Sequence, residues 1–170
     1  ASGWVLEAGS ALSGNDNTDA DPEVLVAIGD LSTSIGAADI TEVEMVTTTA
    51  DKSEGFTISV RVRYNEPVDV VTTGGTPTLA VTNGNEGTGT GRGPHSLSYA
   101  SGTGTNELIF SLAIAAANAA TNADDVLTVG AQTIALNSGT IKDASGTASD
   151  AALVISGAVG TAAGSVTVTA

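Results

Sequence analysis

FTISVRVRY (56–64) carries the clearest structural pattern in this chain. Its apolar residues occupy every second position: Phe56, Ile58, Val60, Val62 and Tyr64. A period of two with β-branched residues is typical of a strand that has one buried face and one exposed face. The stretch therefore predicts a β-sheet with an apolar core on one side and Arg61 and Arg63 on the other.

Similar short runs continue to residue 170, separated by Gly, Ser, Thr, Asn and Pro. We expect strands at 42–48, 56–64, 67–71, 77–82, 96–100, 107–114, 126–129, 133–137, 152–156 and 165–169. The segment 113–125 contains the best local helix candidate, and both a single helical turn and a loop are open there. Regularly spaced short strands are typical of a β-sandwich. We therefore predict an all-β domain over residues 42–170.

The first 41 residues have a different character, because they are small, polar and acidic. Residues 1–54 hold eleven acidic residues against Lys52 alone. The run VLVAIGDL (24–31) is too short and too interrupted by Gly29 to indicate a helix. We predict an irregular acidic N-terminal arm over 1–41, which is disordered in an isolated monomer and ordered by a neighbouring subunit in an assembly. The expected assembly contacts are Trp4, Val5, Leu6, Leu12, Arg61 and Arg63.

Composition narrows the classes of partner and chemistry. The chain of 170 residues has 19 acidic and 5 basic residues, a net charge of −14. Such a surface repels phosphate, so nucleic acid and anionic membrane are poor partners. There is no cysteine, which excludes disulfides and thiolate metal sites. The chain opens on Ala1 without the features of a signal peptide, and we favour removal of an initiator Met over processing as the origin of that end.

Four sequence blocks carry a family resemblance. They are YNEPVDV (64–70), PTLAV (77–81), YASGTGTNELIFSLAI (99–114) and NSGTIKDASGTASDAALVI (137–155). In this order they resemble the bacterial immunoglobulin-like modules of large surface adhesins, which are also found on phage virion proteins. The resemblance implies an immunoglobulin-like β-sandwich. The chain departs from the family pattern at Thr147, where Asn is usual, and at the glycine-rich segment 83–94. Independently of the family, Gly102 and Gly104 suit the positive φ that a tight hairpin requires.

No catalytic constellation is visible in the sequence. His95 is the only histidine, and a catalytic triad or a His-containing metal site needs partners that no spacing here supplies. We therefore expect a structural or solvent-exposed role for His95. The segment NGNEGTGTGRGP (83–94) lacks the Gly-Lys-Ser/Thr ending of a phosphate-binding loop and is interpreted as a hairpin tip. We expect neither catalytic residues nor a cofactor.

One segment offers oxygen ligands at close spacing. NDNTDADPE (15–23) contains the candidate Ca²⁺ ligands Asp16, Asp19, Asp21 and Glu23. The EF-hand pattern fails, because its sixth position is Ala20 or Pro22 instead of Gly. We favour a solvated acidic loop over a Ca²⁺ site. For Arg61 and Arg63, two interpretations stay open: pairing with acids on adjacent strands, or contact with the acidic arm of a neighbouring subunit.

These observations support three hypotheses of function. The first is a structural virion protein, such as a phage capsid decoration or cement protein, whose partners are other copies of itself and a major capsid protein. The second is an immunoglobulin-like module of a bacterial surface adhesin or S-layer protein. The third, an enzyme or a carbohydrate-binding module, is the least supported, because Trp4, Tyr64 and Tyr99 are scattered and Tyr64 falls on the predicted core face.

Overall fold

The structure is a computed structural model that describes residues 2–6, 17–19, 23–28, 36–85, 92–144 and 149–170. The chain divides into two compact units, Ala1–Ile35 and Gly36–Ala170. The predicted boundary lies six residues later, between 41 and 42. Residues 36–41 group with the larger unit because Ala38 is fully buried in its core and the first strand of that unit begins at Ile40.

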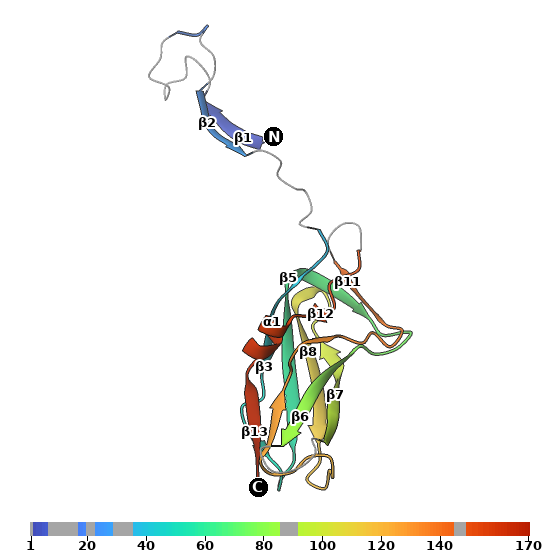
Figure 1. Ribbon diagram of the computed structural model, residues 1–170. Coiled ribbons are helices and arrows are strands. Elements are labelled where there is room, and N and C mark those ends of the chain that lie inside the picture. The colour runs from blue at the N-terminus through green and yellow to red at the C-terminus, as the bar shows by residue number, and fades with distance from the viewer. Residues whose placement is uncertain (1, 7–16, 20–22, 29–35, 86–91, 145–148) are drawn as a thin grey trace. The chain divides into compact units, whose positions relative to one another are not determined.

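The smaller unit contains two antiparallel strands, β1 (Ser2–Leu6) and β2 (Glu23–Ile28) (Figure 1). Trp4 lies opposite Val26, and the register shifts directly after Trp4. The arm is therefore not irregular over these residues, contrary to the prediction. In the sequence, Gly29 makes a helix over 24–31 unfavourable. It comes directly after β2, so it does not interrupt that strand, which is rich in residues that favour strands.

The larger unit is built on one curled sheet of nine strands (Figure 1). These strands are β3 (Ile40–Met45), β4 (Ala50–Asp51), β5 (Phe56–Val71), β6 (Thr78–Asn85), β7 (Arg92–Ser101), β8 (Thr105–Ile114), β9 (Asp125–Thr128), β11 (Thr140–Asp143) and β13 (Ser165–Thr169). Their spatial order is β11-β5-β8-β7-β6-β9-β13-β4, and β3 also pairs with β5. Every pairing is antiparallel except that of β13 with β4. A separate pair joins β10 (Gln132–Thr133) to β12 (Val154–Ile155). The all-β prediction is confirmed.

The longest strand, β5, joins two segments that the sequence analysis separates, 56–64 and 67–71. Its register with β8 shifts between Arg63 and Val68, and this irregularity contains Pro67, which has no N–H to donate. The first part of β5 pairs with β3 and the last part pairs with β11. One strand thus connects two neighbours on the same side.

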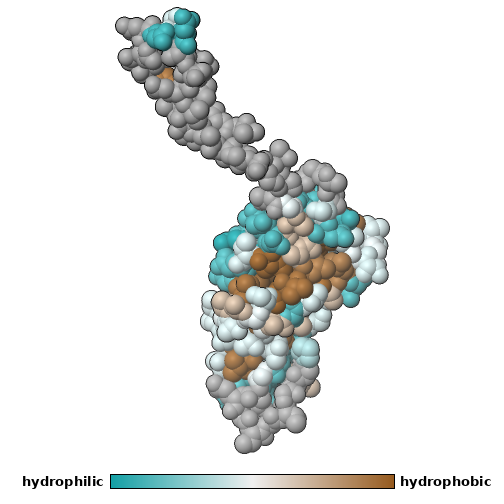
Figure 2. All heavy atoms as spheres, turned by 45° about the horizontal axis from the view of Figure 1, so that its top comes forward, coloured by the Kyte–Doolittle hydropathy of each residue, from teal (hydrophilic) through white to brown (hydrophobic). Residues whose placement is uncertain are grey.

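The core follows the predicted alternation in 56–64. Ile58, Val60 and Val62 are fully buried, and Tyr64 is buried with its hydroxyl donating to the Ala152 carbonyl at 3.1 Å. Phe56, at the start of the strand, is half-buried. The other strands of the sheet supply further buried aliphatic residues, and β8, which pairs with β5, supplies Phe110. At the surface, apolar side chains gather on the upper part of the larger unit (Figure 2).

The helix lies elsewhere than expected. Segment 113–125 contains the end of β8, then turns, and then the start of β9. Among the described residues the single helix is α1 (Gly157–Ala162), which Ser156 caps by accepting a hydrogen bond from the N–H of Val159 at 3.3 Å. In the described part of the chain, no helix has the length and apolar character needed to cross a membrane.

The positive φ expected at Gly102 and Gly104 is confirmed, at 115° and 77°.

Candidate functional site

An ion-pair ladder covers the outer face of β3, β5 and β8. The register places Glu42 opposite Arg63 and Glu44 opposite Arg61, and Arg63 lies opposite Glu107 on its other side. Arg63 Nη1 is 2.6 Å from Glu42 Oε2, and Arg63 Nη2 is 2.6 Å from Glu107 Oε1. Arg61 pairs with Glu44 and lies 3.6 Å from Glu107 Oε2. Of the two interpretations kept open for the arginines, pairing with acids on adjacent strands is present within the larger unit.

The ladder is electrostatically coupled but half-exposed. The hydrogen bond with Glu107, followed by the charge of Glu42, raises the pKa of Arg63 above its ordinary value. The same hydrogen bond from Arg63 lowers the pKa of Glu107. Because these side chains remain in contact with water, their contribution to stability is modest. Three carboxylates against two guanidinium groups leave one net negative charge on this face.

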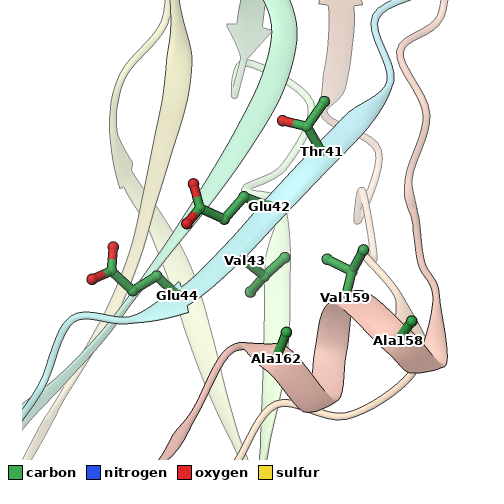
Figure 3. A pocket seen from close by; sticks show the side chains of 7 residues that line it. All are labelled: Thr41, Glu42, Val43, Glu44, Ala158, Val159 and Ala162. Atoms are coloured by element: carbon green, nitrogen blue, oxygen red, sulfur yellow. The ribbon is translucent and has the colours of Figure 1, made fainter.

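A hollow of about 510 Å³ lies beside the ladder, between β3 and α1 (Figure 3). Its lining residues are Thr41, Glu42, Val43, Glu44, Ala158, Val159 and Ala162. In Figure 3 the side chains from α1 are directed toward β3, whereas the carboxylates of Glu42 and Glu44 turn away from α1. The hydroxyl of Thr41 already donates to the carbonyl of Arg63 at 3.3 Å. The lining of the hollow is therefore mostly apolar, and its polar part comes from Thr41, Glu42 and Glu44 on β3.

A backbone hydrogen bond holds one end of the hollow, and two alanines of α1 line one of its sides. The N–H of Met45 donates to the carbonyl of Ala163 at 2.8 Å and ties the end of β3 to the end of α1. Val43 is buried, while Ala158 and Ala162, one helical turn apart, are exposed. This arrangement leaves room over α1 for an additional apolar side chain.

A separate group of polar side chains, the histidine cluster, is buried in the larger unit. It consists of His95, Thr121, Asp125 and Asn83. His95 on β7 is 6% exposed, and its Nε2 lies 2.8 Å from the hydroxyl oxygen of Thr121, which is fully buried. Asp125 accepts a hydrogen bond from the N–H of Asn122 at 2.7 Å, and Asn83 donates to the carbonyl of Ala120. Burial lowers the pKa of His95; the nearby Asp125 carboxylate opposes this shift, and Lys52 adds to it.

The histidine cluster is closed to substrates in this structure. Thr121 and Asp125 are at most 1% exposed, so no reacting group could reach the hydroxyl–imidazole pair. Of the structural and solvent-exposed roles expected for His95, the burial fits the structural one. The sequence analysis did not predict that Asn83, Thr121 and Asp125 lie near His95. One signal was available: if the predicted strand 77–82 is extended to Asn85, its alternation places Asn83 on the buried face.

The remaining predicted site residues lie in or near the smaller unit. Asp16, Asp21 and Leu12 lie outside the described residues. Asp19 lies in an exposed turn, where its N–H donates to Asn17 Oδ1 at 3.1 Å. Glu23 begins β2, while Trp4, Val5 and Leu6 belong to β1. Within the described ranges, no group of three His, Cys, Asp or Glu side chains is placed to hold a metal ion.

In comparisons with known proteins, no protein-family model, curated protein or solved structure matches this chain.

Proposed function

We propose that this chain is a structural protein of a virion, in particular a decoration or cement protein on a phage capsid. In this proposal the smaller unit, residues 1–35, docks on the particle through Trp4, Val5, Leu6 and Leu12. The larger unit is an immunoglobulin-like sandwich that projects outward. The partners are a major capsid protein and other copies of this chain, and the location is the virion.

The β1–β2 pair is the observation that carries the proposal. A two-stranded sheet alone is marginally stable at best in water. In β2 the apolar residues Val24 to Ile28 are consecutive, so both alternating sets of positions are apolar. Strands of this composition are typical of sheets that are covered on both faces. A partner surface is the simplest source of that cover.

The strand order of the larger unit supports an immunoglobulin-like sandwich. If β5, β6, β7, β8, β9 and β13 are strands B to G, the neighbours β5-β8-β7 correspond to B-E-D and β6-β9-β13 to C-F-G. These are the groupings of the two immunoglobulin sheets. The pairing of β6 with β7 joins the two groups into one curled sheet.

Charge limits the kind of surface that could receive the smaller unit. Residues 1–35 carry six acidic residues and no Lys or Arg. The docking surface on the particle would then be apolar with a neutral or basic rim, because like charges oppose association. The same argument disfavours nucleic acid and anionic lipid as partners.

The second candidate is an immunoglobulin-like module of a bacterial surface adhesin or S-layer protein. The four sequence blocks within 64–155 favour it, and it places the chain at the bacterial cell surface. This alternative predicts stability that depends on Ca²⁺. A melting temperature that a chelator leaves unchanged would count against it.

Rebinding to particles tests the docking role. Val26→Asp places a charge in the centre of β2, opposite Trp4, whereas Thr18→Asp places the same charge in an exposed turn as a matched control. We expect the wild type and Thr18→Asp to saturate particles stripped of this chain. We expect Val26→Asp to bind at least about tenfold more weakly, with the thermal unfolding of the larger unit unchanged. Equal binding by all three proteins would contradict the proposal.

A further inference from the structure

We propose that the hollow between β3 and α1 is a docking site for a segment of another protein in which apolar side chains alternate with Lys or Arg. The site lies on the larger unit, so it is a second interface in addition to the docking role proposed for β1 and β2. It is independent of that role, because none of its residues belongs to the smaller unit.

The chemistry of the hollow favours a protein segment over a small polar ligand. Small-molecule sites place a few convergent polar groups around an apolar pocket to fix the ligand's orientation. Here the hydroxyl of Thr41 is already used by the Arg63 carbonyl, and the carboxylates of Glu42 and Glu44 turn away from α1 (Figure 3). The lining is apolar in its larger part, through Val43, Val159 and the two alanines of α1, which suits the apolar side chains of an extended peptide.

Two exposed valines lie next to the elements of the hollow along the chain. Val154 is 66% exposed and lies on β12, directly before α1 in the chain. Val46 is 44% exposed and directly follows β3. Figure 2 shows apolar residues gathered on one part of the surface of the larger unit. These two exposed valines add apolar side chains on segments that adjoin β3 and α1 in the chain, the two elements that line the hollow.

The flank of the hollow selects the charge of the occupant. The side chains of Glu42 and Glu44 are 48% and 45% exposed, so a cation on a partner could reach their carboxylates. With Arg61, Arg63 and Glu107 they form the ladder that carries one net negative charge. At this acidic face, a partner segment with basic residues is favoured over a second copy of this chain, whose net charge is −14. Charge complementarity therefore favours a partner segment that carries Lys or Arg.

The geometry of α1 determines which variants test the site. Ala162 lines the hollow, whereas Thr161, its neighbour on the same helix, does not. Both residues are exposed, so neither substitution disturbs the core. Ala162→Gln places a polar side chain in the hollow, and Thr161→Gln adds the same side chain outside it as the matched control.

The experiment is an NMR titration of the full-length ¹⁵N-labelled chain with three capped peptides. The probe is Lys-Val-Lys-Leu-Lys, and the controls are Lys-Ser-Lys-Ser-Lys and Glu-Val-Glu-Leu-Glu. We expect the probe to shift amide signals of β3 and α1 and the controls to leave them unchanged. Ala162→Gln should weaken binding of the probe by about tenfold or more, and Thr161→Gln should not.

Several results would overturn the inference. Equal shifts with the serine peptide would mean that general attraction to an acidic protein explains the binding. Shifts away from β3 and α1, or the absence of any shift, would mean that the hollow receives no such segment. Concentration-dependent shifts of β3 and α1 without any peptide would assign this face to a second copy of the chain. Loss of particle rebinding by Val26→Asp is a separate result and leaves this test unaffected.

Discussion

Gly160 lies where α1 packs closely on the backbone of Gly130 and Ala131. A Cβ atom at this position would lie 2.1 Å from the Gly130 carbonyl oxygen and 3.0 Å from the Ala131 backbone nitrogen. At Gly157, in the same helix, a Cβ atom would meet nothing within 4 Å. Helix propensity alone favours Ala over Gly at both positions. The two glycines therefore separate helix propensity from packing.

We expect opposite outcomes for the two alanine substitutions. Gly160→Ala should lower the free energy of unfolding by about 2 kcal/mol or more, because the clash is with backbone atoms. Gly157→Ala should be neutral or raise the free energy of unfolding by up to about 1 kcal/mol. Urea denaturation followed by circular dichroism measures both. Stabilisation by Gly160→Ala would show that α1 does not pack on Gly130 as described.

His95 predicts a specific dependence of stability on pH. Burial lowers its pKa below the ordinary value of 6.5, so the unfolded chain binds more protons when the pH falls below about 6.5. The contribution of neutral His95 to stability is therefore present above that pH and is lost as the pH falls. Urea midpoints at pH 7.5, 6.5 and 5.5 should decrease for the wild type.

The control for His95 is a side chain that does not titrate. His95→Gln should be less stable at pH 7.5, because it disturbs the contact with Thr121, but its midpoint should change little between pH 6.5 and 5.5. Titration of Glu107 does not contribute to the change in stability expected between pH 7.5 and 5.5. The pKa of Glu107 is lowered from 4.5 by Arg63, so its contribution is lost only below about pH 4.5. A slope in His95→Gln equal to that of the wild type would refute the assignment.

At the scale of elements, the ladder joins β3, β5 and β8 through Glu107, which contacts both Arg61 and Arg63. We expect Glu107→Gln to cause a small fall in the urea midpoint that largely disappears in 1 M NaCl, because exposed ion pairs are screened by salt. Glu42→Gln should have a smaller effect, since Glu42 pairs with Arg63 alone. A loss that persists unchanged in high salt would mean that packing, not charge, is the cause.

Elements that carry their own alternating pattern could be predicted from the sequence. The strand SVTVT (165–169) coincides with β13, and 107–114 lies within β8. Helix α1 could not be predicted, because GAVGTA contains two glycines and is stabilised by the Ser156 cap and by packing on Gly130. Strand β4 has two residues and exists only through its parallel pairing with β13. Such elements depend on tertiary contacts that local patterns do not contain.

The candidate sites needed the whole molecule for the same reason. The outward direction of Arg61 and Arg63 follows from alternation, but their partners Glu42, Glu44 and Glu107 follow from the register of three strands. The hollow requires α1, whose place no sequence pattern indicates. The histidine cluster joins residues from β6, β7, β9 and the turn before β9. Spacing along the chain therefore predicted the faces of strands but not the groups that assemble on them.

We propose that the two units of the chain have different tasks: the β1–β2 pair assembles with a particle, and the larger unit presents surfaces such as the β3–α1 hollow. The most direct measurement is quantitative mass spectrometry of purified virions, with the copy number of this chain expressed relative to the major capsid protein. We predict a fixed, stoichiometric ratio that survives repeated purification. Absence of the chain from the particles, or a ratio that falls with each purification step, would contradict the proposed function.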